Sequence, residues 1–354
     1  MTSKAAVSLA LLLLAGTAGA AAAAEPVLHL RSTPQTVVRG YISAERAPVM
    51  RIHSGQTVEI DTISHGGLNP DPVAFFGAAG IPASAVLQDA IDISKMPTEP
   101  GFGGHVLTGP IYIEEAEPGD MLEIRILKVE PRVPYGTNSA GPGGAAPGVV
   151  KDRVTKVYKW DPKRRITEVV PGVEFPIAPF MGIMAVAPAP EVKRVGSRAP
   201  GLFGGNLDFK ALKAGATLYL PVMTKGGLFV TGDSHAAQGD GEVSGNAIEA
   251  SMTPTLQFIV HKGEGKAMAA PWAEDADNYY ALVLDKDLDV ALSKSIEEAI
   301  KLLGAKKGMK PTDALSMASV AIDFGVAEAV DETLVIFGKI PKAYFKAKTP
   351  YWTK

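Results

Sequence analysis

The residues best suited to chemistry in this chain of 354 residues lie between Gly232 and Glu242. The stretch reads Gly-Asp-Ser-His-Ala-Ala-Gln-Gly-Asp-Gly-Glu, which places carboxylates and an imidazole among three glycines. Asp, Glu and His side chains bind metals and carry protons, and glycine lets the backbone approach a ligand closely. The spacing puts Asp233 and His235 on one face of an extended segment. A solvated turn is the alternative, but apolar segments on both sides favour a motif held at strand ends inside a cleft.

Several segments along the chain resemble the acetamidase/formamidase family, a group of amide hydrolases. The matching segments are residues 61–67, 104–113, 116–122, 180–188, 204–209 and the motif at 232–242. The resemblance runs from about residue 37 to residue 252, and more weakly to about residue 345. It implies hydrolysis of the carbon–nitrogen bond in small linear amides such as formamide or acetamide, with release of ammonia and a carboxylate.

A divalent metal would meet the needs of amide hydrolysis, because it activates bound water and polarises the carbonyl. Such a site takes two or three His, Asp or Glu ligands and keeps one position open. The candidate ligands are His65, Asn206, Asp208, Asp233 and His235. His65 and Asp208 also have a structural interpretation as turn residues. We expect zinc from this mixed set, with calcium as the alternative if Asn206 and carboxylates predominate.

Glu242 and His105 are the candidate catalytic residues. Glu242 follows the ligand pair in the glycine-rich turn, where it could accept a proton from water and deliver it to the departing ammonia. His105 lies in Gly-Gly-His-Val-Leu-Thr-Gly-Pro, and the sequence leaves open whether it orients the site or only packs. A serine nucleophile is disfavoured, because the chain lacks a Gly-x-Ser-x-Gly motif and adjacent strand residues such as Ser234 and His235 face opposite ways.

Charge and cysteine content exclude two function classes. The net charge is −3, and no basic run interleaves with aromatic residues, which argues against a nucleic-acid partner. The chain contains no cysteine, so the cysteine nucleophile of nitrilase-type amidases is not available to it. Stability must then come from an apolar core, which a chain of this length can supply.

Residues 1–24 predict a signal peptide. Lys4 precedes an apolar run over residues 5–15, and the small residues that follow offer Ala-x-Ala cleavage sites. We expect export to the periplasm or the medium, a mature chain beginning between Ala21 and Glu25, and no membrane association afterwards. N-terminal sequencing of the protein from fractionated cells tests this. An intact Met1 on cytoplasmic protein would contradict it.

Alternation of apolar and polar residues predicts a mainly β, α+β fold for the mature chain. The expected strands cover residues 37–42, 49–52, 56–62, 111–113, 121–127, 154–158, 167–170, 173–177, 218–222, 228–230 and 255–260. Ser54 and Gly55 predict a hairpin turn between the second and third of these. Residues 85–91 favour a short helix, and helical spacing returns at 288–303 and 311–320.

The family resemblance implies two β-sandwich-like halves, of jelly-roll or CUB-like type, and a C-terminal α/β segment. We place the halves at residues 25–130 and 150–262 and the α/β segment at 263–354. Between the halves, residues 131–149 are rich in Pro and Gly and predict a long loop, either a lid or a disordered linker.

Two functions from different classes fit these features. The first is a metal-dependent hydrolase of small linear amides, encountered outside the cytoplasm. The second is a non-catalytic periplasmic protein that binds a small ligand or a metal on the same fold. The expected partner is a small amide, and the resemblance also implies a homodimer or a higher homo-oligomer.

Overall fold

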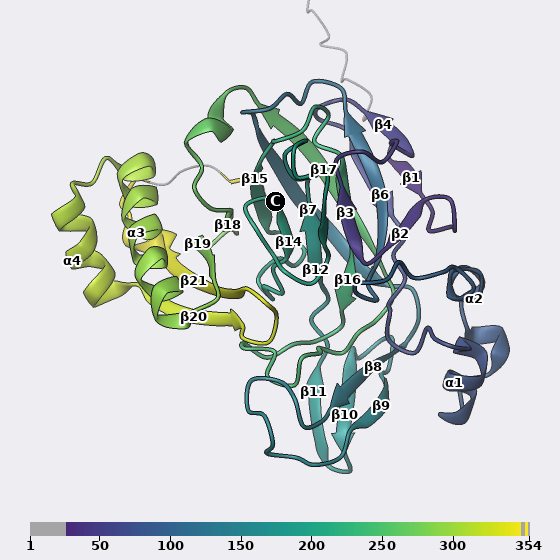
Figure 1. Ribbon diagram of the computed structural model, residues 1–354. Coiled ribbons are helices and arrows are strands. Elements are labelled where there is room, and N and C mark those ends of the chain that lie inside the picture. The colour runs from purple at the N-terminus through teal and green to yellow at the C-terminus, as the bar shows by residue number, and fades with distance from the viewer. Residues whose placement is uncertain (1–25, 348–350, 353–354) are drawn as a thin grey trace, which may run out of the picture.

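The computed structural model describes residues 26–347 and 351–352, so the expected signal peptide at residues 1–24 lies outside the described residues. Strands dominate, as expected, and helices lie mainly at the two flanks (Figure 1). Two large sheets contribute side chains to one apolar core, which includes Ile124 and Leu218 from one sheet and Met184 and Phe229 from the other. This core holds the strand ends that carry the polar motif.

The larger sheet has nine strands, and neighbours are antiparallel except for the parallel pair at one edge. In spatial order it contains β1 (Leu28–Leu30), β5 (Thr57–Ile60), β17 (Met252–His261), β7 (Met121–Pro131), β15 (Thr217–Pro221), β18 (Trp272–Glu274), β19 (Asn278–Asp285), β21 (Leu334–Pro341) and β20 (Asp323–Glu328).

The second sheet carries the start of the motif. In spatial order it contains β14 (Gly204–Asn206), β12 (Phe180–Ala185), β16 (Phe229–His235), β6 (Val106–Ile113) and β2 (Val37–Arg39), with β4 (Met50–Ile52) parallel to β6. Every residue of β12 and β16 is buried. A strand buried on both faces should be apolar throughout, yet β16 ends in Asp233, Ser234 and His235. Its polar end therefore needs partners inside the protein.

Both sheets contain strands from residues 25–130 and 150–262, and in the larger sheet these strands interleave, so the sheets do not separate at the boundary expected between two halves. The hairpin predicted at Ser54 and Gly55 is wrong. β4 pairs with β6 in the second sheet, whereas β5 pairs with β17 in the larger one. The turn thus carries the chain from one sheet to the other, which two short alternating segments cannot reveal.

Short strand pairs complete the β structure. β8 (Tyr135–Ala140) pairs with β9 (Val154–Lys159), and β10 (Ile166–Val170) pairs with β11 (Val173–Pro176). They form an arm below the sheets in Figure 1. β3 (Tyr41–Ser43) and β13 (Arg194–Gly196) make a third pair. β8 lies within the loop expected at 131–149, and its Thr137 exchanges backbone hydrogen bonds with Glu249, a partner remote in sequence. Residues 141–149 contain no helix or strand, as expected for a loop.

The helices lie outside the sheets. They are α1 (Pro72–Ala78), α2 (Gln88–Ser94), α3 (Leu288–Lys307) and α4 (Pro311–Ala321), with short 3₁₀ turns at Ala83–Ala85, Glu264–Ala267 and Lys342–Tyr344. The predictions of helices at 288–303 and 311–320 are confirmed. α3 packs on β19 and β21, and α4 packs on α3, within an apolar cluster that includes Tyr279 and Leu303. Sequence reading missed α1, although Asp71 caps it and Pro72 begins it.

Among the described residues, no helix combines the length and the apolar character needed to cross a membrane.

Candidate functional site

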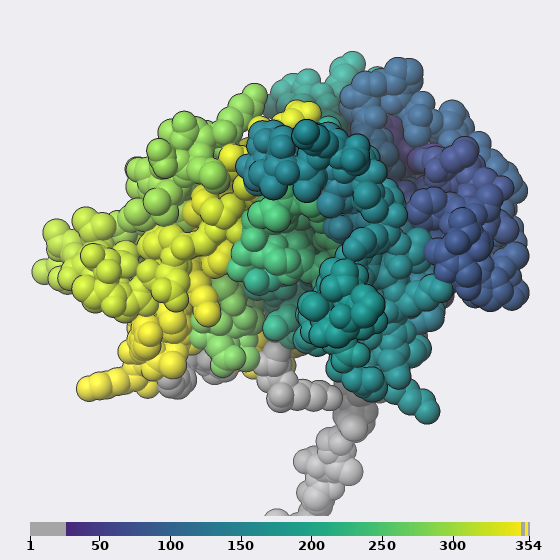
Figure 2. Space-filling model, turned by 90° about the horizontal axis from the view of Figure 1, so that it is seen from below, coloured from purple at the N-terminus to yellow at the C-terminus, as the bar shows by residue number. Residues whose placement is uncertain are grey.

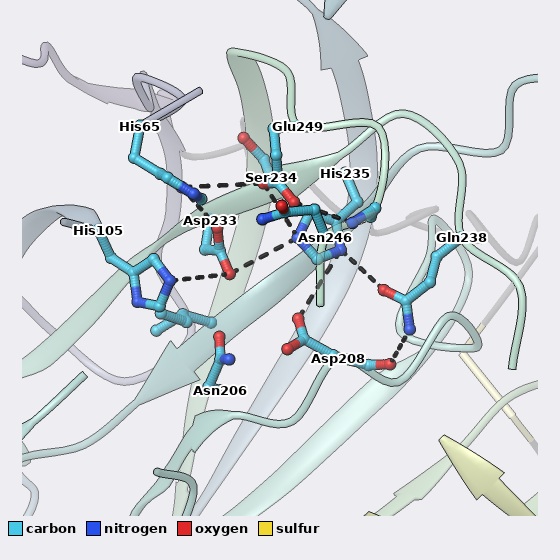
Figure 3. Close-up of polar contacts among 12 residues, drawn as sticks. His65, His105, Asn206, Asp208, Asp233, Ser234, His235, Gln238, Asn246 and Glu249 are labelled. Atoms are coloured by element: carbon cyan, nitrogen blue, oxygen red, sulfur yellow. Dashed lines mark hydrogen bonds and ion pairs between the residues drawn. The ribbon is translucent and has the colours of Figure 1, made fainter. Parts of the chain in front are cut away.

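Polar side chains from six segments meet at the end of β16 (Figure 3). Asp233 and His235 lie on β16 itself. His65 follows β5, His105 directly precedes β6, and Asp208 follows β14. Glu242 comes from the loop after β16, and Glu249 from the segment that leads into β17. Six of the seven residues predicted as ligands or catalytic groups therefore enter one cluster, and Asn206 lies beside it.

The backbone at this cluster is strained. Asp208, Asp233 and Glu242 have φ angles of 40°, 48° and 43°, in the left-handed region that non-glycine residues seldom adopt. The simple extended spacing expected for residues 233–235 therefore does not hold, yet the two side chains still converge. On the neighbouring strand, a Cβ at Gly182 would lie 2.4 Å from Asp208 Oδ1, so only glycine leaves room for that carboxylate.

Asp233 lies among three imidazoles. Its Oδ1 is 3.2 Å from His65 Nδ1, and its Oδ2 is 3.8 Å from His105 Nε2 and 3.5 Å from His235 Nε2. Glu249 closes the arrangement from the other side, with Oε2 3.3 Å from His235 Nε2. His235 is fully buried, whereas His65 and His105 keep 23% and 13% of their side chains exposed, so access to the cluster is from their side.

Several buried polar atoms of this cluster have no hydrogen-bond partner. They are His65 Nδ1, Asn206 Oδ1, Asp208 Oδ1, Asp233 Oδ1, His235 Nε2 and Glu249 Oε2. Buried polar atoms nearly always have a partner, so this concentration requires an explanation. Three groups place their potential ligand atoms within 4.8 Å of one another: His65–His105–Asp233, Asp233–His235–Glu249 and Asp208–His235–Glu242. Imidazole nitrogens and carboxylate oxygens are donor types that divalent cations bind.

The charges in the cluster shift each other's ionisation. Burial lowers the pKa of His65, but its contact with Asp233 and the charge of Glu249 outweigh this and raise the pKa to about 9. Burial also lowers the pKa of His235, but the charges of Glu249 and Asp233 outweigh this and raise the pKa well above its usual value. The pKa of Asp233 lies well below its usual value, because the neighbouring imidazoles overcome the effect of burial. Asp233 therefore stays ionised.

Asp208 and Glu242 form the second half of the cluster. Burial, and then the charge of Glu242, raise the pKa of Asp208 well above its usual value. The pKa of Glu242 is also well above its usual value, because burial and the nearby carboxylates outweigh the charge of His235. Asp208 Oδ1 lies 3.7 Å from His235 Nδ1, at the opposite edge of that ring from Glu249. These two carboxyls are suited to hold a proton.

Hydrogen-bond partners fix which atom of Asn206 and of His105 faces the cluster. Asn206 Nδ2 donates a hydrogen bond to Asp331 Oδ2, which leaves its Oδ1 without a partner. His105 Nδ1 lies 2.9 Å from Ser197 Oγ, so its Nε2 is the nitrogen that faces Asp233. His105 thus has the geometry of a ligand, beyond the orienting role weighed from the sequence.

Sequence reasoning missed Glu249 and Gln238. Glu249 lies in the apolar segment that leads out of the motif. A lone carboxylate in such a run was the available signal of a functional residue, because charged side chains are rarely buried without a partner. Gln238 lies inside the motif and is hydrogen-bonded to His235. Neutral amides attract less notice than ionisable groups, although they commonly orient them.

A cavity of 730 Å³ borders the outer side of the motif. Gln238, Glu242 and Asn246 line it, together with side chains of the hairpin arm and of the C-terminal segment. In the view from below, the teal arm and the yellow-green C-terminal segment flank the green surface between them (Figure 2). Glu242 therefore contacts solvent on one side and the buried cluster on the other.

Comparison with known proteins supports the resemblance seen in the sequence. The model of the acetamidase/formamidase family matches residues 87–200 and 192–347. Over 199 residues the chain is 26% identical to an acetamidase of Mycolicibacterium smegmatis, covering 40% of this chain and 49% of that one. It is 28% identical over 192 residues to a formamidase of Methylophilus methylotrophus, covering 40% and 47%. The matches thus span about half the length of these curated relatives.

The fold extends the likeness over nearly the whole chain. The crystal structure of an acetamidase from Bacillus halodurans superimposes with a TM-score of 0.74 and 25% identity, covering 90% of this chain and 99% of the other. An acetamidase from Yersinia enterocolitica gives the same TM-score at 23% identity. The cluster around Asp233 is thus set in an architecture that these solved structures share.

Proposed function

We propose that this chain, which belongs to the acetamidase/formamidase family, is a metal-dependent hydrolase of small linear amides. The observation that carries the proposal is the set of buried, unpartnered donor atoms around Asp233. A protein that only binds a metal on the same fold would also have a cation site, but it would not need two further carboxyls suited to proton transfer beside it. Asp208 and Glu242 supply these.

The donor set fits a cation on the Asp233 side of His235. The groups that would hold it come from two overlapping sets, His65–His105–Asp233 and Asp233–His235–Glu249, which share Asp233. Three imidazoles with carboxylates suit zinc better than calcium, which prefers oxygen ligands. When bound, the ion activates water and polarises the amide carbonyl.

The alternative cation group, Asp208–His235–Glu242, fits less well. His235 Nδ1 is the nitrogen that Asp208 faces, and it is already hydrogen-bonded to Gln238 Oε1 at 2.9 Å. Asp208 and Glu242 are therefore free for proton transfer. Glu242 takes up and returns the proton that must pass from water to the departing ammonia, and the adjoining cavity lets it exchange with solvent.

The direct test is ammonia release by the purified, zinc-loaded protein. We expect release from formamide, acetamide or a closely related short amide, and little or none from the same protein after chelation. Matched samples without protein control for spontaneous hydrolysis. Zinc binding without ammonia from any amide of the panel would refute the enzyme and favour the non-catalytic binding protein.

A further inference from the structure

Gln238 connects three segments of the cluster. Its Nε2 donates hydrogen bonds to the backbone oxygens of Asp208, at 2.7 Å, and Ala327, at 3.3 Å. Its Oε1 lies 2.9 Å from His235 Nδ1 (Figure 3). Gln238 thus joins the end of β16 to the segment after β14 and to β20.

These contacts fix which way the amide points. Two carbonyl oxygens can only accept hydrogen bonds, so the NH₂ group of Gln238 must face them. The amide oxygen then necessarily faces His235, and it too can only accept. Nδ1 of His235 must therefore carry a hydrogen. The other ring nitrogen, Nε2, is left to lose its proton when a cation binds.

The geometry points to Gln238 as a positioning residue that selects Nε2 of His235 as the metal-binding nitrogen; this rests on the proposed metal site. Nε2 is buried, has no hydrogen-bond partner, and faces Asp233 and Glu249 at 3.5 and 3.3 Å. Residues that hold the second nitrogen of a ligating histidine fix its tautomer and ring orientation in this way.

The competitor that Gln238 excludes is Asp208. Its Oδ1 lies 3.7 Å from His235 Nδ1 and has no hydrogen-bond partner of its own. Without the amide oxygen, the ring would be free to rotate and donate its Nδ1 hydrogen to Asp208, and this would tie that carboxyl to the imidazole. A neutral amide holds the ring without adding charge to a cluster that already contains four carboxyl groups.

The test compares zinc affinity in three variants, measured by chelator competition. Gln238→Leu keeps the bulk and removes every hydrogen bond, and we expect a loss of roughly 10–100-fold. Gln238→Glu keeps an acceptor for Nδ1 but loses both donors, so its affinity should lie closer to that of the wild type. Gln88→Leu changes an exposed glutamine that bonds only to Asp92 in α2, and serves as the matched control.

Two further measurements separate positioning from plain stability. Thermal unfolding of the metal-free variants shows the structural cost, and ¹⁵N-histidine NMR of the zinc-loaded protein shows which nitrogen of His235 carries hydrogen. We expect Nδ1–H in the wild type. Unchanged zinc affinity in Gln238→Leu would overturn the inference. The inference would also be overturned if Gln238→Leu and Gln238→Glu lost affinity and stability equally. The same holds if the metal were bound to Nδ1 of His235, or if the wild type bound no zinc. A wild type that binds zinc but hydrolyses no amide would refute the proposed function alone.

Discussion

Replacing His235 by alanine should remove both bound zinc and amide hydrolysis. His235 is the one fully buried imidazole of the cluster, and its Nε2 lies between Asp233 and Glu249. Its loss removes a ligand and takes away an imidazole that both carboxylates face, so the affinity should fall by more than the roughly 10–100-fold typical of a supporting residue. Metal analysis after dialysis and ammonia release measure the two effects.

His261→Ala is the matched control. His261 is the last residue of β17, whereas the site lies near the first residue of that strand, Met252. The imidazole of His261 contacts Glu123 and not the cluster. It should keep both zinc and activity. Full metal content and full turnover in His235→Ala would show that the cation is held elsewhere.

Glu242→Gln should retain zinc but lose turnover by about two orders of magnitude or more, the usual contribution of a positioned proton carrier. Glutamine keeps the size of the side chain and cannot take up a proton. Because Glu242 lies with Asp208 on the other side of His235 from the proposed ligands, the metal content should not change. The kcat for acetamide and the zinc content of the purified variant check the two halves of this prediction.

Asp240→Asn tests whether any carboxylate in this loop has the same effect. Asp240 lies two residues before Glu242, pairs with Lys210 at 2.8 Å, and is outside the metal-ligand groups. It should retain normal turnover. If Glu242→Gln kept wild-type turnover, another group would have to carry the proton. Glu249→Gln would then be the next variant to measure.

The sequence predicted local features better than their pairing. Alternation and capping located most strands and both C-terminal helices, because these signals depend on neighbouring residues. Pairing of β5 with β17, and the passage from β4 to β5 between sheets, depend on contacts far apart in the chain. Local alternation carries no information about such partners, so the hairpin prediction at Ser54 failed.

The candidate site shows the same division. Residue type and the glycine-rich setting indicated Asp233, His235 and Glu242, and the resemblance added His65 and Asp208. Glu249 and Gln238 gain their roles only from tertiary contacts, with His235 Nε2 and Nδ1 respectively. The left-handed backbone at Asp233 was also hidden, since aspartate tolerates that conformation without a glycine to mark it.

The presence of early and late strands in both sheets bears on when the protein could acquire the proposed ion. Thr62 bonds to the backbone of Met252 across 190 residues, and His65 lies beside that contact. No chain that lacks β17 can build the cluster, because the loops that bring its parts together close only when those distant segments meet. If the chain crosses a membrane unfolded, the ion it receives is set by the metals available at its destination, and not by those in the compartment where it is synthesised.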